Sequence, residues 1–322
     1  MTAVEVVDGI DAGAIAHYGN PAVEGRALDD GTGVVDLSHR DVITVSGPDR
    51  LGWLHDLTTQ HFTALAAGEG TSALILDAQG HIEHVMYGVD DGDTFFAHTE
   101  PGRGAALVQF LDSMRFMRRV DVALRTDDLA VVWQPGDAPD GRITRQGADS
   151  LGGHESFIPR GHLSDFLERI EGPRVGLWAW EARRVAAGVP RIGVDTDHRT
   201  IPNELGVLGV SVHLEKGCYR GQETVARVHT LGRPPRRLTL LHLDGSMDAL
   251  PEVGADLALA EKPDRVVGRV GSSARHHELG PIALALLKRN VPVEAPIVVG
   301  DIAAAQETIV DPEVGLHVRP LR

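Results

Sequence analysis

The sequence predicts an α+β protein that ends in a small β-barrel. Short β-branched runs alternate with amphipathic helical segments over residues 1–231, which is typical of an α+β region with a mainly antiparallel sheet. From residue 236 onward, short strands separated by turn residues follow one another, which is typical of a barrel. A stiff, proline-bearing segment at 231–235 separates these two sequence patterns. We therefore expect an α+β region over residues 1–231 and a barrel domain over residues 232–322.

The first elements follow from local sequence signals. Residues 1–32 are rich in Gly and Asp and only weakly periodic, so we expect an irregular lead-in. Two β-branched runs predict strands at 34–37 and 42–45. A helix is predicted over 48–57, because a capping serine, an early proline and an acidic residue precede three leucines at helical spacing.

A hairpin is predicted next, with strands at 73–76 and 81–89. Residues 77–80 supply the turn, and Gly80 can adopt the positive φ that a tight turn needs. Residues 134–161 are predicted to be mostly loop with a short strand or two. The other expected elements are strands at 94–97, 120–124 and 129–133, helices from Pro101, near 163–170 and over 177–187, and barrel strands at 238–243, 266–270, 282–287, 297–299 and 315–318.

Charge and cysteine content exclude several kinds of protein. The 322 residues include 31 Lys and Arg against 46 Asp and Glu, a net charge of −15, and a single cysteine. One thiol cannot form an internal disulfide, a Cys-based zinc finger or a four-thiolate iron–sulfur site. So acidic a chain has no bulk attraction for phosphate backbones, although this leaves a local basic patch open. We expect no nucleic-acid partner.

The chain gives no targeting or membrane signal. Its first residues are acidic and lack a basic region followed by an apolar one, and no stretch approaches the 18 or so apolar residues of a membrane span. We therefore expect a cytoplasmic protein without a membrane partner, and the single cysteine agrees with a reducing compartment.

The densest group of reactive side chains surrounds the only thiol. Lys216 and Arg220 flank Cys218 at two residues on either side. In an extended segment they would lie on its own face and favour the thiolate, which makes the three residues candidates for catalysis. The alternative is a buried, inert cysteine beside a turn.

This segment resembles a known family. Lys-Gly-Cys-Tyr-Arg-Gly-Gln-Glu at 216–223 resembles the K-G-C-Y-x-G-Q-E signature of the YgfZ-type folate-binding proteins. These proteins are relatives of the glycine-cleavage aminomethyltransferase and act in the maturation or repair of iron–sulfur proteins. The stretches at 184–190 (R-x-x-x-G-x-P) and 201–205 (I-P-x-E), and the segments 57–60 and 76–80, also fit, so the resemblance covers about residues 34–322.

The resemblance implies three subdomains arranged like a clover around a channel that holds tetrahydrofolate, two of them intertwined within residues 1–231 and the third a C-terminal barrel. It implies that the Glu204 carboxylate holds the pterin edge, because a carboxylate accepts two adjacent N–H groups in one plane. The anionic tail of folate needs cations. The remaining candidates for folate binding are Arg184, Arg236 and Arg237 for the tail, and Tyr219 and Gln222 of the signature.

One departure from the related aminomethyltransferases bears on activity. Those relatives carry an aspartate that promotes one-carbon transfer where this chain has Ala105, and Glu100 is the only nearby acid. The leading hypothesis is therefore a tetrahydrofolate-binding accessory factor that uses Cys218 with an iron–sulfur client or assembly protein. The alternatives are a tetrahydrofolate-dependent aminomethyl- or demethyl-transferase and a folate sensor with an inert cysteine, so whether the chain is an enzyme stays open.

Histidines supply no convincing metal site in the sequence. His81 and His84 point to opposite faces of the predicted strand, and the pair at 276–277 lies in a polar turn. We expect no resident metal.

Overall fold

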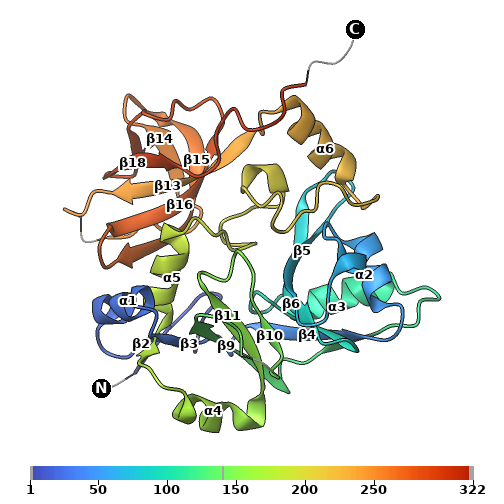
Figure 1. The fold of residues 1–322 in the computed structure, drawn as a ribbon. Helices are drawn as coiled ribbons and strands as arrows, with labels where there is room; N and C mark the ends of the chain where they lie inside the picture. Colours follow the sequence, from blue (N-terminus) through green and yellow to red (C-terminus); the bar gives the residue numbers. More distant parts are fainter. Residues whose placement is uncertain (1–2, 140, 248, 319–322) are drawn as a thin grey trace. The chain divides into compact units, whose positions relative to one another are not determined.

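A computed structural model describes residues 3–139, 141–247 and 249–318 (Figure 1). These residues form two compact units that do not follow the order of the chain. Unit 1 holds the described residues of 1–75, 84–180 and 209–219, and unit 2 holds those of 76–83, 181–208 and 220–322.

The first sheet of unit 1 has the strand order β5-β6-β7-β4-β8. Its strands pair antiparallel, as in the ladder of β4 with β7 that joins Val45 to Phe95. Leu54 of one helix and Leu107 of another are fully buried with Phe95, so both helices pack on this sheet. The elements are β4 (Asp41–Ser46), α2 (Arg50–Leu57), η1 (Phe62–Ala64), β5 (Gly70–Leu76), β6 (Ile82–Asp90), β7 (Thr94–Thr99), α3 (Gly104–Ser113) and β8 (Asp121–Leu124).

The second sheet of unit 1 has the order β10-β11-β9-β3-β12. Strand β12 runs parallel to β3, whereas the other pairs are antiparallel. The rings of Trp133 and Trp180 lie 4.8 Å apart in the core beside this sheet. The elements are β3 (Val34–Asp36), β9 (Leu129–Pro135), β10 (Thr144–Arg145), β11 (Gly153–Pro159), η2 (Arg160–His162), α4 (Leu163–Arg169) and β12 (Arg174–Val175). The predicted α+β class with a mainly antiparallel sheet is confirmed.

The expected irregular lead-in is wrong. Residues 21–29 form helix α1 (Pro21–Asp29), and β1 (Val4–Glu5) pairs with β2 (Ile15–His17). The Asn20 side chain accepts hydrogen bonds from the backbone N–H groups of Ala22 and Val23 at 3.1 and 3.3 Å, and proline occupies the first turn. The Asn-Pro pair was the local signal for this helix, because it combines a capping side chain with a proline whose φ suits the first turn.

Unit 2 contains a closed barrel with the order β13-β16-β15-β14-β17-β18. Its strands lie wholly within residues 232–322, so the predicted barrel is confirmed. Fully buried Leu241, Ala283 and Ile297 belong to its core. The strands are β13 (Arg236–Leu243), β14 (Asp256–Leu259), β15 (Lys262–His276), β16 (Gly280–Lys288), β17 (Ile297–Val299) and β18 (Ile302–Thr308).

The strand expected at 315–318 is wrong. Strand β18 pairs with both β13 and β17 and so closes the sheet, which leaves no edge for a further strand. The backbone N–H groups of Leu316 and Val318 donate instead to the carbonyl oxygens of His229 and Thr230, at 2.8 and 3.0 Å. These acceptors belong to the last turn of α6 (Gln222–Leu231), so the segment follows a helix end and not the barrel.

Helix α5 (Leu177–Ala186) begins in unit 1 and ends in unit 2, and the helix predicted over 177–187 is confirmed. A single turn, η3 (Pro202–Glu204), follows it in unit 2. Among the helices of the described residues, none combines the length and the apolar composition that crossing a membrane requires.

Candidate functional site

The signature segment lies where the chain passes from unit 1 to unit 2. Cys218 belongs to unit 1 and Arg220 to unit 2. Gly221 has a φ of +79° and directly precedes Gln222, the first residue of α6. A Cβ on Gly221 would lie 2.6 Å from the backbone oxygen of Asp77, so only glycine fits this approach of the β5–β6 turn to the start of the helix.

Cys218 is exposed and lies outside the helices and strands. It is also the only thiol in the chain. A bulky reagent or a metal centre carried by another protein can therefore reach its sulfur. Because Cys218 is exposed, the alternative of a buried cysteine is excluded.

Lys216 points into unit 1. It is 5% exposed, and its Nζ donates to the carbonyl oxygens of His55 and Thr58, the latter at 2.5 Å. The same Nζ lies 5.0 Å from the centre of the Tyr219 ring. Burial lowers the pKa of Lys216 to about 8 and raises the pKa of Tyr219 to about 12. The ammonium group is thus held by backbone carbonyls, whereas the thiol of Cys218 is exposed.

Arg220 lies at the surface of unit 2. Its Nη1 lies 3.2 Å from Oε2 of Glu83, and both side chains are about half exposed. A surface pair of this kind stabilises little. Its guanidinium can exchange Glu83 for another anion at small cost.

Glu204 and Arg236 pair with each other in unit 2. Arg236 donates from Nε to Oε1 of Glu204 at 2.8 Å and from Nη2 to Oε2 at 2.9 Å. The Ile201 backbone N–H donates to the same Oε2 at 3.1 Å, and Glu204 is fully buried. Arg236 further donates to Asp197 at 2.7 Å and to the Thr200 hydroxyl at 3.1 Å. Although burial opposes it, the hydrogen bond from Arg236 lowers the pKa of Asp197.

Arg184 belongs to a buried ion-pair network in which all its N–H groups are hydrogen-bonded. Its five N–H groups donate to Glu181 twice, at 3.0 and 2.7 Å, to Asp195 at 3.0 Å, to the Val189 carbonyl and to the Ser272 hydroxyl. The residue is 3% exposed. Because a guanidinium has five N–H groups, no donor remains for a ligand in this arrangement.

Arg237 lies inside the barrel and is fully buried. It donates from Nη1 to the Lys288 carbonyl at 3.2 Å and from Nη2 to the Gln306 amide oxygen at 2.8 Å. Burial lowers the pKa of Arg237, against the opposing effect of Asp311. The two arginines after the linker therefore point to different surroundings, because successive side chains of β13 lie on opposite faces.

Glu100, the acidic residue that the sequence offers near Ala105, is buried and lies beside an arginine. Glu100 is 1% exposed, and its carboxylate lies 3.8 Å from the guanidinium of Arg40. Ala105 lies exposed in the first turn of α3. The carboxylate that does lie at the start of α3 is that of Asp41, whose Oδ2 accepts a hydrogen bond from the Gly104 N–H at 2.6 Å.

Unit 1 also contains a polar cavity of about 340 Å³ that the sequence did not reveal. Its wall includes the carboxylates of Glu69 and Asp149 and the imidazoles of His61 and His213. The ring of His61 lies 4.8 Å from that of His55 and 5.0 Å from that of His213. The volume falls within the range of small-ligand pockets, and the lining offers both acceptors and imidazoles.

Arg145 organises one wall of this cavity. It is 1% exposed and donates to the Thr71 carbonyl at 2.9 Å, to the Ser150 hydroxyl at 2.9 Å, to Glu155 at 2.9 Å and to Asp149. The only sequence signal for this network was an arginine and an aspartate four residues apart around a glycine, within a segment expected to be mostly loop.

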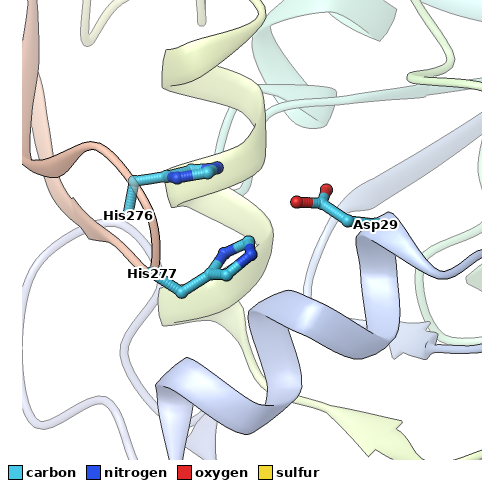
Figure 2. A group of neighbouring side chains, drawn as sticks. All are labelled: Asp29, His276 and His277. Atoms are coloured by element: carbon cyan, nitrogen blue, oxygen red, sulfur yellow. The ribbon is translucent and has the colours of Figure 1, made fainter.

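The other histidines noted in the sequence lie in different surroundings. His81 Nδ1 lies 2.8 Å from the Asp77 carboxylate within unit 2, whereas burial lowers the pKa of His84 in unit 1. The rings of His276 and His277, at the end of β15, are 4.6 Å apart (Figure 2). Figure 2 also draws Asp29 of α1, which belongs to unit 1, and we assign no metal site to side chains from different units.

Comparisons with known proteins agree with the fold. No model of a known protein family matches the chain. The crystal structure of the glycine cleavage system aminomethyltransferase T from Bartonella henselae superposes with a TM-score of 0.80 at 18% identity, and covers 97% of this chain and 94% of that one. This confirms the predicted aminomethyltransferase-type fold with a C-terminal barrel.

Similar sequences include a putative chloroplastic transferase of Arabidopsis thaliana, 27% identical over 72% of this chain and 61% of its own length. An iron–sulfur cluster assembly factor IBA57 homolog of Chaetomium globosum is 24% identical over 80% of this chain and 72% of its own length. The tRNA-modifying protein YgfZ of Escherichia coli is 43% identical over 243 residues, which are 67% of this chain and 73% of that protein. With the aminomethyltransferase-type fold and the signature around Cys218, this similarity shows that the chain belongs to the YgfZ family.

Proposed function

We propose that this protein is a tetrahydrofolate-binding accessory factor in iron–sulfur cluster assembly or repair, and that Cys218 is the residue that meets the cluster. The observation that carries the proposal is an exposed, solitary thiol within the full signature of a YgfZ family member. The name of one relative, an iron–sulfur cluster assembly factor, supports the cluster part of the proposal.

In this proposal, Cys218 acts by coordinating an iron ion of the cluster. A thiolate donates an electron pair to iron, and an iron ion itself promotes loss of the thiol proton. One thiolate supplies only one ligand of a cluster, so a client or assembly protein must supply the others. Because Lys216 is held by two backbone carbonyls, the proposal relies on the cluster iron, and not on this lysine, to favour the thiolate.

Fewer residues fit folate binding in the structure than the sequence predicts. Arg184 and Arg237 are engaged inside unit 2, so they do not fit a contact with the tail of folate. Glu204 fits a pterin edge by its chemistry, since it is a carboxylate with both oxygens in one plane. Its ion pair with Arg236 must open first, because both oxygens are bonded and buried.

The thiol is tested in a bacterial strain that lacks its own YgfZ-type protein. The wild-type chain should restore the activity of iron–sulfur enzymes, whereas Cys218→Ser and Cys218→Ala should not. Ser164→Ala, at an exposed position of α4, serves as the control. If Cys218→Ala restores the activities as fully as the wild type does, Cys218 has no role in cluster chemistry.

Folate binding is tested by calorimetry with tetrahydrofolate. Glu204→Gln keeps an oxygen for the Ile201 N–H but loses the charge, and should weaken binding at least tenfold. Asp197→Asn is the matched comparison, because Asp197 bonds the same arginine from outside the buried pair, and its loss should strengthen binding and not weaken it. Absence of binding to the wild type would refute the folate assignment. Turnover of an aminomethyl donor with tetrahydrofolate would instead favour the transferase alternative.

A further inference from the structure

Residues 114–119 form the loop that follows α3 (Figure 1). This loop exposes two large apolar side chains to solvent. Phe116 is 86% exposed and its neighbour Met117 is 97% exposed. Single exposed apolar side chains are common at protein surfaces. Two adjacent ones, an aromatic and a methionine, are the residue types that interface cores favour.

The base of this loop is held in place. The indole N–H of Trp53 donates to the Met114 carbonyl at 3.0 Å. At the other end, the backbone N–H and Nη2 of Arg119 both donate to the Asp49 carboxylate at 2.8 Å. The tip is therefore presented from a fixed frame, which reduces the ordering cost of binding.

The tip is also strained. Phe116 has a φ of +46°, in the left-handed region that residues with a Cβ avoid. The side chain gains no burial in return, since it is almost fully exposed. Unfavourable backbone conformations of this kind persist where the surrounding structure enforces them, and they cluster at binding sites.

Three arginines surround the apolar tip. The side chains of Arg115, Arg118 and Arg119 are 40%, 49% and 74% exposed. Arg115 donates to an aspartate through Nη1 and Arg118 through Nη2, so each guanidinium keeps further N–H groups for a carboxylate of a partner. The loop itself carries three positive charges on a chain of net charge −15, and each of them is paired with an aspartate of the same unit.

We propose that residues 115–119 are a docking site for a partner protein that offers an apolar pocket bordered by carboxylates. Phe116 and Met117 would fill the pocket, and the arginines would pair with its rim. A protein is favoured over a lipid or nucleic-acid surface, because the charge of the whole chain repels anionic lipids and phosphate backbones. This inference goes beyond the proposed function, since it depends neither on Cys218 nor on folate.

The test begins with a photoreactive side chain in cells of the source organism. Met117→p-benzoylphenylalanine should cross-link one or a few proteins that the same substitution at Ala106, an exposed position of α3, does not capture. Each captured protein is then purified, and its affinity for the full chain is measured by interferometry. The double variant Phe116→Ser/Met117→Ser should bind at least tenfold more weakly, and Arg118→Gln should weaken binding mainly at low salt.

The variants should fold, because the substituted side chains make no buried contact, and unchanged melting temperatures would verify this. The proposal is overturned if no protein is captured, if the capture is the same from Ala106, or if the double variant binds with wild-type affinity. Cross-links to lipid, to nucleic acid or to a second copy of this chain would also overturn it.

Discussion

Replacement of Arg184 by lysine separates a structural role from a ligand-binding role. The arginine uses five N–H groups on four partners: two carboxylates, one carbonyl and one hydroxyl. Lysine keeps the positive charge but has three N–H groups on one atom, so at least two of the five hydrogen bonds are lost. A hydrogen bond to a charged group contributes about 1.5–3 kcal/mol, which predicts a loss of about 3–6 kcal/mol.

The lower end of this range applies, because Arg191 also faces these carboxylates. Its Nη1 lies 3.4 Å from Glu181, and its backbone N–H donates to Asp195 at 2.7 Å. We therefore expect Arg184→Lys to lower the free energy of unfolding of unit 2 by about 3 kcal/mol, or the melting temperature by about 6–12 °C.

The assay is thermal and urea unfolding followed by circular dichroism, with Arg199→Lys at an exposed site of the same unit as the control. Two units can give two transitions, so the loss should appear in one of them. If Arg184→Lys unfolds within about 1 kcal/mol of the wild type and loses affinity for tetrahydrofolate, the reasoning fails and the arginine serves the ligand instead.

Three further changes have defined outcomes. Because the folded-state pKa of Asp197 is lowered, its ion pair with Arg236 stabilises the fold fully above about pH 4 and progressively less as the pH falls. Urea unfolding from pH 3 to 7 should therefore show a weaker acid destabilisation in Asp197→Asn. Burial lowers the pKa of Lys216 to about 8, so the unfolded state binds more protons between about pH 8 and 10.4, and stability should rise over that range in the wild type but not in Lys216→Met. Phe116→Gly should raise the free energy of unfolding by about 1 kcal/mol by removing left-handed strain, and should weaken the proposed docking, both measured on the same preparation.

Much of the fold followed from local sequence patterns, and the omissions have identifiable causes. The barrel strand at 297–299 was predicted with its bounds as observed, because a β-branched run stands between turn residues. Strand β18 was missed, since its three successive alanines carry no β-branched signal and its pairing with β13 and β17 comes from closure of the barrel. Closure is a long-range property that no local window contains.

The candidate site was less predictable than the fold. The signature made Cys218 a candidate, and in the structure this cysteine is exposed. Alternation along an extended segment suggested a cation beside it, but the segment forms no strand and Lys216 turns inward. Arg184 carried an overlooked signal, because Glu181 precedes it by three residues on a predicted helix and such pairs meet on one face.

The pairing of Glu204 with Arg236 limits how one folate molecule can use both residues. The family resemblance implies that the carboxylate holds the pterin edge and the guanidinium the anionic tail. These two groups lie at opposite ends of folate, with the aminobenzoyl ring between them. In the structure the two side chains are 2.8 Å apart. An extended folate cannot reach both without moving one of them, so at most one assignment holds in this arrangement. Arg236 has the greater freedom to move, since its side chain is 22% exposed and Asp197 holds it from outside, whereas Glu204 is buried and bonded to the Ile201 N–H. The pterin assignment of Glu204 therefore requires that Arg236 swing outward, and binding should then become stronger when Asp197→Asn loosens the pair on its outer side. An unchanged affinity in Asp197→Asn, together with a loss in Glu204→Gln, would show that the carboxylate acts without any release of the arginine.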